Sequence, residues 1–583
     1  MKFRLIVMMV FVWCLWFGSV SWGATEKSGL IYYPKTGAEA IAMNTAIEAR
    51  GIPATIKFVH TGSGVSTPYV FDEDVTFSEL ITLENENAAV LVASTGIDVV
   101  LPPPGNIVAG PNQKIFDGEG SFTFSSGGVR HVGWWGFDES ASGTANALAV
   151  NSAMDAYSMG TILYPVGSFN CDYIDFDANN LVHEGGGNYR DGTTLVSTVF
   201  GGVSFLFSAT RNTFNNIAFS GGSTATKAHV TGYYIDFYKC RGYAHTTYQV
   251  HSSGIDISFH GGNYHNTGST APTAVMVVEW NDTLLDDVNF NGGLKSPGVL
   301  VKKIDRAQIL NFNMINCELE SGISGQLLIS SDMSGLSIND NYWETESGQA
   351  YTTYHMKIDD GVWCSGDVSG NLFGQSDFDM WIDRISHSSV LNIVGNSISS
   401  YSKVDVDYDS VADNYPFKMP TLNFHTNGRL TTSVRNIQLD NDAWRVEEIR
   451  CKHGASLYAE GAFEIEFSGF RLETANATET SLFEVTVPDS GSGVYPRAIF
   501  LEAKVSGRDA SGSGTDINWY QDQVLIKNTA SAAILGSGVT VAIEDDVTFD
   551  FGIDVIDDKA RVRCAGKSGD VNWIGDVTIK RLW

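Results

Sequence analysis

Four glutamates near the middle of the 583-residue chain have a spacing that suits acid–base chemistry. Glu318 and Glu320 are two residues apart, and so are Glu344 and Glu346. Residues two apart on a β-strand point to the same side. Carboxyl groups held close together repel as like charges, which raises one pKa and prepares that group as a general acid. We therefore predict that these four glutamates are catalytic residues.

The distance between neighbouring strands adds a constraint on the same glutamates. If successive turns of chain stack as parallel strands, Glu318 and Glu320 lie almost above Glu344 and Glu346. Neighbouring strands are about 4.8 Å apart, near the carboxyl separation of retaining glycosidases, and carboxylates two coils apart approach the inverting separation. The alternative is that they are ordinary solvated residues on a flank of the fold. Four nearby residues are predicted to bind substrate, two as aromatic surfaces and two as extra carboxylates: Trp343, Trp280, Asp286 and Asp287.

Asparagine spacing indicates which elements would position these residues. Five asparagines follow one another at intervals of 25, 25, 30 and 25 residues: Asn291, Asn316, Asn341, Asn371 and Asn396. Intervals of this size match one turn of a parallel β-solenoid. Asparagine suits the turns because it tolerates the left-handed αL backbone, and its amides can stack as a ladder from turn to turn. The pattern predicts a parallel β-helix across the middle of the chain.

A motif upstream supports the same fold. Trp134–Phe137 reads Trp-Trp-Gly-Phe, an apolar stripe at helical spacing follows over Ala145–Tyr157, and Leu163–Phe169 reads as an apolar strand with Pro-x-Gly and an aromatic. This order resembles the start of the right-handed parallel β-helix in the pectate-lyase-like superfamily, which includes rhamnogalacturonase/epimerase-like and phage tail-spike-like proteins. The resemblance implies a polysaccharide partner. An acidic turn usual in the superfamily is mostly absent, since Asp138–Thr144 reads Asp-Glu-Ser-Ala-Ser-Gly-Thr.

We predict an all-β protein of four parts. Residues 1–23 read as a signal peptide, with Lys2 and Arg4 before an apolar run and Ser21-Trp22-Gly23 at the cleavage site. Residues 24–130 form an N-terminal β segment with short, closely spaced strands. Residues 131–410 form the right-handed parallel β-helix. Residues 411–583 alternate like an antiparallel β-sandwich, an end domain that could also form oligomers.

The signal predicts the compartment. A cleaved signal peptide directs the protein to the cell exterior, the periplasm or the cell surface. The apolar run is about 16 residues, shorter than the roughly 20 needed to cross a bilayer, so no stable membrane span remains after cleavage. Six cysteines remain, widely spaced and without Cys-x-x-Cys, which predicts buried thiols rather than a disulfide or zinc framework.

Charge limits the partners. The formal net charge of −30 repels phosphate backbones, which argues against nucleic acid as a partner. It also repels uronate polymers unless a cation or a basic groove intervenes. No cofactor is required and no metal site is predicted. Asp405, Asp407 and Asp409 alternate in a way that could hold Ca²⁺, although Ser410 stands where an EF-hand loop needs glycine. A lyase would need a base, for which the sequence offers His251, His260, His265 and Lys295.

Two functions are consistent with these residues. The first is a carbohydrate-active β-helix protein that binds and cleaves an extracellular or cell-surface polysaccharide as a hydrolase or a lyase. The second is a non-catalytic glycan-binding adhesin or tail-spike-like receptor-binding protein, for which a homotrimer is the expected assembly. The sequence leaves open whether the protein is an enzyme.

Overall fold

The computed structural model describes residues 30–407 and, beyond 407, the strands named below. Within 30–407 the gaps are 63, 188–191, 200–201, 222–225, 244–247, 266–273, 294–296, 303–307, 323–324, 345–351, 360–361, 375, 384–388, 395 and 397–402. The predicted signal peptide, 1–23, lies outside the described residues. The chain divides into two compact units, the first formed by residues up to 138 with 152–163, and the second by 139–151 with 164–583.

The first unit opens with a helix that the sequence analysis missed, α2 (Gly37–Arg50). Thr36 caps its start, because the Thr36 hydroxyl accepts a hydrogen bond from the backbone N–H of Glu39 at 3.2 Å. Gly51 ends it in the αL conformation, with φ 63°. The threonine, the following glutamate and the terminal glycine are helix signals that were present in the sequence.

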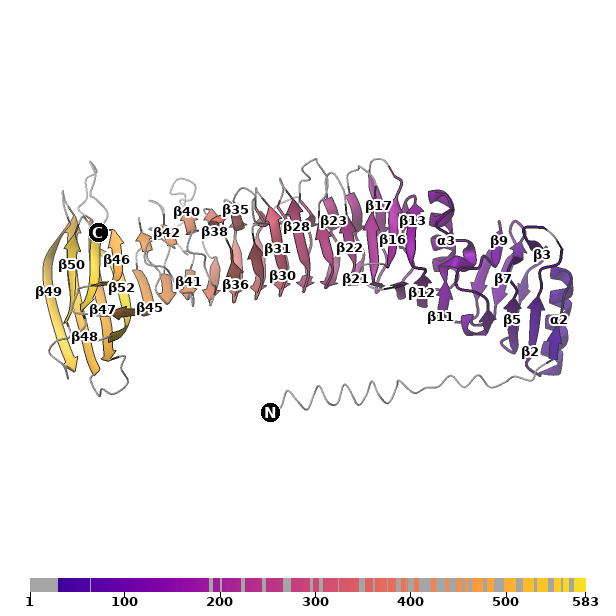
Figure 1. The fold of residues 1–583 in the computed structure, drawn as a ribbon, viewed down its shortest axis with the longest axis horizontal. Coiled ribbons are helices and arrows are strands. Elements are labelled where there is room, and N and C mark those ends of the chain that lie inside the picture. The colour runs from indigo at the N-terminus through magenta and orange to yellow at the C-terminus, as the bar shows by residue number, and fades with distance from the viewer. Residues whose placement is uncertain are drawn as a thin grey trace. The chain divides into compact units, whose positions relative to one another are not determined.

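Short parallel strands make up the rest of the first unit (Figure 1). One sheet runs β1 (Leu30–Tyr32), β2 (Ala54–Phe58), β5 (Ile81–Asn85) and β8 (Ile107–Val108). A second runs β4 (Val75–Thr76), β7 (Asp98–Leu101) and β10 (Ser121–Phe124), and a third β3 (Thr67–Phe71), β6 (Ala89–Ala93) and β9 (Phe116–Gly118). The strands β11 (Gly128–His131) and β12 (Gly160–Tyr164) also pair in parallel. The N-terminal β segment is therefore itself a small parallel solenoid.

The Trp-Trp-Gly motif lies in the core of this first unit. Trp134 is buried, its ring packs against Phe116 and Phe124, and its Nε1–H donates to the Gly110 carbonyl at 3.2 Å. Gly136 follows at φ 90°, a conformation that favours glycine. The motif thus packs the first solenoid, and none of these contacts involves a catalytic group.

The helix predicted over 145–157 is confirmed as α3 (Gly143–Asp155). Its first turns are tied to β13 (Gly167–Cys171) and the residue after it: the buried Asn146 amide donates to the Asn170 carbonyl at 2.8 Å, and the Thr144 hydroxyl donates to Asp172 at 2.5 Å. These bonds hold the first turns of the helix against β13, the first of its run of parallel strands.

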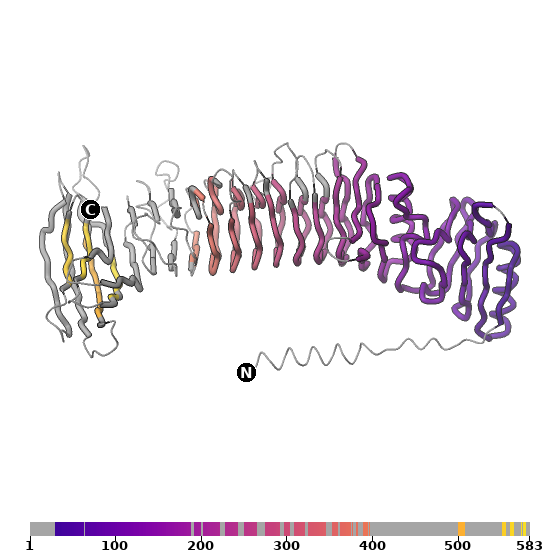
Figure 2. Tube along the Cα trace, in the orientation of Figure 1, coloured from indigo at the N-terminus to yellow at the C-terminus, as the bar shows by residue number. Residues whose placement is uncertain are grey.

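Three parallel sheets build the solenoid part of the second unit (Figures 1 and 2). From β13 to β37 each coil of chain adds one strand to each sheet, and the described strands of later coils belong to sheets I and II. Sheet I contains β14 (Ile174–Asp175), β17 (Val203–Phe207), β20 (Thr226–Val230), β23 (Tyr248–Ser252), β26 (Met276–Val278), β29 (Val299–Val301), β32 (Leu327–Ile329), β35 (Thr352–Ile358), β38 (Ser376–Asp383), β40 (Lys403–Asp407), β42 (Ile437–Leu439) and β44 (Leu457–Ala459).

Within a coil, a strand of sheet II follows the strand of sheet I, and a strand of sheet III follows as far as β37. Sheet II contains β15 (Leu181–Gly185), β18 (Thr213–Asn215), β21 (Tyr233–Tyr238), β24 (Ile255–His260), β27 (Thr283–Asp286), β30 (Ile309–Ile315), β33 (Met333–Asn339), β36 (Cys364–Ser369), β39 (Val390–Val394), β41 (Thr421–His425) and β43 (Glu448–Lys452). Sheet III contains β13, β16 (Thr193–Ser197), β19 (Ile217–Ser220), β22 (Arg241–Tyr243), β25 (Asn263–His265), β28 (Asn289–Gly293), β31 (Glu318–Gly322), β34 (Tyr342–Glu344) and β37 (Leu372–Phe373). The predicted parallel β-helix is confirmed.

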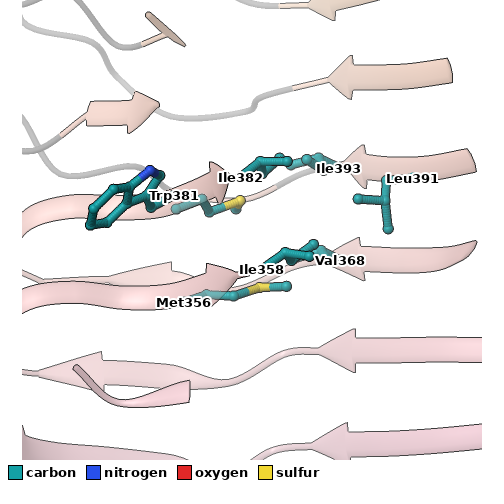
Figure 3. A pocket seen from close by; sticks show the side chains of 8 residues that line it. Met356, Ile358, Val368, Trp381, Ile382, Leu391 and Ile393 are labelled. Carbon is teal, nitrogen blue, oxygen red and sulfur yellow. The ribbon is translucent and has the colours of Figure 1, made fainter. Parts of the chain in front are cut away.

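Apolar side chains fill the interior of this β-helix in stacked columns. The rings of Phe214, Phe237 and Phe259 stack from coil to coil, with centroids 5.2 and 4.8 Å apart. Burial of each such side chain stabilises the fold by about 1.5–3 kcal/mol. Further along, side chains of β35, β36, β38 and β39 enclose an apolar gap lined by residues such as Met356, Ile358 and Leu391 (Figure 3). We assign this gap to the packing of the core.

The asparagine ladder is present in part, at the corner between sheets II and III. Asn341, Asn371 and Asn396 are buried and stack: the Asn341 amide donates to Asn371 Oδ1 at 2.9 Å, and the Asn371 amide donates to Asn396 Oδ1 at 2.8 Å. Asn316 instead occupies the preceding αL position at φ 54°, and Asn291 lies on β28. The regular spacing reflected the coil length, but only three of the five residues share one structural position.

Antiparallel strands close the chain, as predicted for the C-terminal β-sandwich. β45 (Glu464–Thr474), β47 (Arg497–Asp509), β48 (Ile517–Asn528), β49 (Ala532–Ile543) and β52 (Val571–Leu582) form one set, and β46 (Thr480–Thr486), β50 (Asp550–Ile556) and β51 (Lys559–Ala565) form another. Parallel pairing continues from β39 through β41 and β43 to β45. The change of strand direction therefore comes near 464, and the predicted boundary at 411 falls inside the parallel region.

Four cysteines of the described residues are buried with free thiols, as expected from their spacing: Cys171, Cys240, Cys317 and Cys364. Cys564 is also buried. Burial raises the pKa of the Cys240 and Cys317 thiols to about 12, so both remain protonated. Among the residues that the structure describes, no helix is long and apolar enough to cross a membrane.

Candidate carboxylate site

The predicted glutamates lie on the outer face of sheet III. On β31, Leu319 points into the core with 1% of its surface exposed, so its neighbours Glu318 and Glu320 both point outward. Glu344 has the corresponding outward position on β34, whereas Glu346 lies outside the described residues. The alternation of the strand thus places three of the four predicted carboxylates on one surface.

The observed register differs from the predicted one by two residues. Glu320 is paired with Glu344, and Glu318 is paired with Tyr342. On the other side of β31, Glu318 is paired with Asn289 and Glu320 with Asn291. The prediction that Glu318 lies almost above Glu344 is therefore wrong. The repeat between these strands is 24 residues, whereas a pairing of Glu318 with Glu344 needs 26.

Hydrogen bonds connect the carboxylates to each other and to the asparagines. The Asn289 amide donates to Glu318 Oε2 at 2.8 Å, and the Asn291 amide donates to Glu320 Oε2 at 3.2 Å. The Glu318 and Glu320 side chains are two residues apart on the same outward face of β31. Burial and the negative charge of Glu318 raise the pKa of the Glu320 carboxyl. The protonated form of Glu320 is therefore favoured relative to a free glutamate.

Tyr342 is the aromatic residue that the sequence analysis missed. Its side chain is 37% exposed beside the carboxylates. Burial, a hydrogen bond to Glu344 and the charges of Glu344, Glu318 and Glu320 raise the pKa of the Tyr342 phenol. It therefore remains a neutral phenol at physiological pH. Its outward position could have been inferred from the strand period, since Tyr342 and Glu344 are two residues apart.

Trp343 cannot stack on a sugar in this structure, which corrects the prediction for this residue. Its side chain is 0% exposed and lies inside the β-helix, where it stacks on Phe373 with centroids 5.4 Å apart. The reason is again the strand period: Trp343 is the register partner of the buried Leu319 and shares its inward direction.

A buried polar network supports the carboxylates from below. The Gln326 amide donates to the carbonyls of Leu319 at 2.9 Å and Glu344 at 2.6 Å, which links the two strands of the site. Gln326 Oε1 lies 2.6 Å from His355 Nδ1, so His355 carries its proton on Nδ1. Burial lowers the pKa of His355 to about 3, which keeps the imidazole neutral. The network fixes the backbone on both sides of the Glu320–Glu344 pair.

The remaining predicted binding residues lie on other faces. Trp280 follows β26 of sheet I and is 39% exposed. Asp286 ends β27 of sheet II, where its carboxylate lies 3.3 Å from His260 Nδ1. Asp287 occupies the αL corner at φ 56°. The structure does not bring these three residues to the Glu320 face, where the same coil contributes Asn289 and Asn291.

The histidines named as bases for a lyase also separate. His251 lies on β23 of sheet I, His260 on β24 of sheet II and the backbone of His265 on β25 of sheet III. No group of three or more His, Cys, Asp or Glu side chains among the described residues is arranged to hold a metal ion. Asp405 and Asp407 lie on β40, and Asp409 lies outside the described residues.

Comparison with known proteins gives weak likenesses. No protein-family model matches the chain, and neither does any curated protein. Among solved structures, the chain is similar to the tailspike protein of Acinetobacter phage vB_ApiP_P1, at 13% identity over 77% of this chain and 87% of that one, with a TM-score of 0.34.

Two further likenesses are of the same kind. The tailspike protein gp49 of Pseudomonas phage LKA1 matches at 8% identity over 92% of each chain, with a TM-score of 0.32. The Pantoea stewartii glycan biofilm modifying enzyme WceF, which has a tailspike-like parallel β-helix fold, matches at 13% identity over 76% of this chain and 60% of that one, with a TM-score of 0.26. Because these values are low, the fold rests on the strand register described above.

Proposed function

We propose that the protein binds a polysaccharide along the outer face of sheet III and hydrolyses its glycosidic bonds. The observation that carries the proposal is the group of outward carboxylates Glu318, Glu320 and Glu344 on two paired strands, in which the pKa of Glu320 is raised. Glycoside hydrolysis needs one protonated and one ionised carboxyl group at the same pH. Tyr342 and the neighbouring asparagines supply an aromatic ring and neutral amides for a sugar.

Each carboxylate has a distinct role in this proposal. Glu320 donates its proton to the leaving glycosidic oxygen, and Glu344 attacks the anomeric carbon to form a glycosyl-enzyme bond as the old bond breaks. Water then attacks the anomeric carbon, Glu320 takes a proton from that water, and the bond to Glu344 breaks. Strand spacing of about 4.8 Å between Glu320 and Glu344 is close to the separation of retaining enzymes. Burial and the charge of Glu318 favour the protonated form of Glu320 before the reaction.

A lyase is less consistent with the same surface. The described outward side chains of β28, β31 and β34 are Asn289, Asn291, Glu318, Glu320, Tyr342 and Glu344, which include no lysine, arginine or histidine. The raised pKa of Tyr342 disfavours the tyrosinate that could act as a base. Three carboxylates also repel the uronate polymers on which lyases act.

One observation favours a second candidate, a glycan-binding protein without catalysis. Glu184 on sheet II accepts hydrogen bonds from the amides of Asn215 at 2.8 Å and Asn216 at 3.1 Å. Glu318 and Glu320 accept the same kind of hydrogen bond from asparagines, but the Glu184 contact contains no second carboxylate. Asparagine–glutamate contacts therefore join neighbouring coils without a catalytic role at Glu184. In the adhesin or receptor-binding function, the surface of sheet III binds the glycan and does not cleave it.

Location and assembly complete the proposal. The proposed substrate is an extracellular or cell-surface polysaccharide, which agrees with the predicted signal peptide and with a secreted, periplasmic or surface location. The homotrimer also stays a prediction, and light scattering of the purified protein would test it.

Incubation with capsular and exopolysaccharides tests the proposed function. A hydrolase releases reducing ends without a rise in ultraviolet absorbance, whereas a lyase produces unsaturated uronates that absorb. Binding without either product would support the adhesin instead. A rise in absorbance together with reducing ends would contradict the hydrolase.

A further inference from the structure

A separate hollow lies on the outer face of sheet II. Its volume is about 550 Å³, within the range of small-molecule binding sites. It extends over four successive coils, from β21 to β30, and it includes none of the residues of the carboxylate site. The hollow therefore has no role in the proposed hydrolysis.

Two parallel columns of side chains line this hollow. One column, the αL column, consists of residues with αL backbone within or just before these strands: Tyr234, Asp256, Asp282 and Asn311. The other follows the strand register and consists of Asp236, Ser258, Leu284 and Asn313. Since neighbouring coils are about 4.8 Å apart, the columns present a polar group at nearly every coil along the hollow.

Hydrogen bonds within the hollow leave it rich in acceptors. The Ser258 hydroxyl donates to Asp236, and the Asn311 amide donates to Asp282 Oδ1 at 2.6 Å. Burial and the charge of Asp282 raise the pKa of Asp256. The described His, Cys, Asp and Glu side chains form no group of three that could hold a metal ion, so the carboxylates do not converge on one point. Spread along a line, they suit a chain of hydroxyl donors better than a single cation.

Tyr234 is the unusual residue of the αL column. Its backbone has φ 57°, a conformation that aspartate, asparagine and glycine adopt readily but that is an outlier for a bulky side chain. Its ring is 53% exposed at the hollow, and the Arg211 guanidinium lies 6.0 Å from the ring centroid. A strained and exposed aromatic residue in a hollow indicates a functional constraint.

We propose that this hollow is a second saccharide site that binds an uncharged, hydroxyl-rich segment of a glycan. The Tyr234 ring would contact the apolar face of a sugar, and the aspartates would accept hydrogen bonds from its hydroxyls. Three aspartates against one arginine give the hollow a negative potential, so uronate units are excluded. The proposal shares with the proposed function only the premise that the ligand is a glycan.

Binding measurements with defined oligosaccharides test the site. The probes are neutral hexaoses of glucose, galactose and mannose, their N-acetylated counterparts, and a galacturonate hexamer. The protein carries Glu320→Gln in every measurement, so that cleavage cannot remove the probe. We expect millimolar or tighter binding of at least one neutral hexaose, at least tenfold weaker binding in Tyr234→Ala, and no binding of the galacturonate.

Tyr233→Ala is the matched control, because Tyr233 is the exposed neighbour of Tyr234 and does not line the hollow. It should change the affinity less than twofold. Equal losses in the two variants, Tyr234-dependent binding of galacturonate, or no Tyr234-dependent binding of any neutral hexaose would each overturn the proposal. Loss of hydrolysis in Glu320→Gln with intact Tyr234-dependent binding would separate this site from the proposed function.

Discussion

At the scale of single residues, the site depends on the protonation of Glu320. The raised pKa of Glu320 means that the folded protein favours its protonated form. Its contribution to stability is present below the pKa of an unfolded glutamate and is lost as the pH rises through the folded pKa. The same carboxyl that is prepared to donate a proton therefore destabilises the fold at neutral pH.

Substitution of this carboxyl gives a pH-dependent stability change. Glu320→Gln removes the repulsion with Glu318, so the variant should be more stable than the wild-type protein at pH 8, and the advantage should shrink toward pH 4. Urea unfolding midpoints across this range provide the measurement. Glu184→Gln, which also loses an asparagine-bonded carboxylate, is the control and should not gain stability at pH 8. A constant difference between wild type and Glu320→Gln at all pH values would contradict the raised pKa of Glu320.

The strand period explains which site residues could be predicted. Glu318 and Glu320 were found because two-residue spacing on a strand places side chains on one face. The same rule assigns Trp343 to the interior and Tyr342 to the surface once Leu319 is known to be buried. The expected pairing of Glu318 with Glu344 was wrong by two residues, because the register between coils cannot be read from local spacing.

At the scale of elements, corner residues decide how coils connect. Asn371 is buried and accepts hydrogen bonds from the backbone N–H and the amide of Asn341, while its own amide donates to Asn396 and to the Ile338 carbonyl. Asn316 has the exposed αL position of its corner. One amino acid thus serves two different purposes at neighbouring positions.

These two purposes predict opposite responses to mutation. Asn371→Ala leaves several buried groups without partners and should cost roughly 2–4 kcal/mol of unfolding free energy. Asn316→Gly keeps a residue that tolerates positive φ and should change stability by less than about 0.5 kcal/mol. Chemical denaturation of both variants measures the difference. Similar losses for the two would show that the ladder does not stabilise the corner.

Elements also show where sequence reasoning stops. The coil length of about 25 residues was predictable from the asparagine spacing, and the helix α3 from its apolar stripe. Helix α2 was missed because alanines give it a weak apolar stripe. The boundary at 411 was misplaced because local alternation does not show whether strands pair in parallel, which is decided by strands far apart in sequence.

At the scale of the whole molecule, buried histidines limit stability in acid. Burial and the neighbouring His251 lower the pKa of His229 to about 4, and burial lowers that of His355 to about 3. Their stabilising contribution is complete above the pKa of an unfolded histidine, about 6.5, and is lost as the pH falls toward these values. The chain has 12 histidines and a formal net charge of −30, so its net charge changes as the pH falls through this range.

Thermal unfolding as a function of pH measures this effect. The wild-type protein should lose stability between pH 6.5 and 4. His229→Gln keeps a polar group near Ser253, whose hydroxyl lies 3.0 Å from His229 Nε2, and should give a shallower decline. An unchanged slope in His229→Gln would exclude His229 from the acid response.

The central claim is that Glu320 and Glu344 make the β-helix a polysaccharide hydrolase. The most direct measurement is the rate of reducing-end release from a polysaccharide that the wild-type protein binds, compared among wild type, Glu320→Gln and Glu184→Gln. We predict a fall of at least about 100-fold for Glu320→Gln with binding retained, and a change of less than twofold for Glu184→Gln. Full hydrolysis by Glu320→Gln, or binding by the wild-type protein without any release of reducing ends, would contradict the claim.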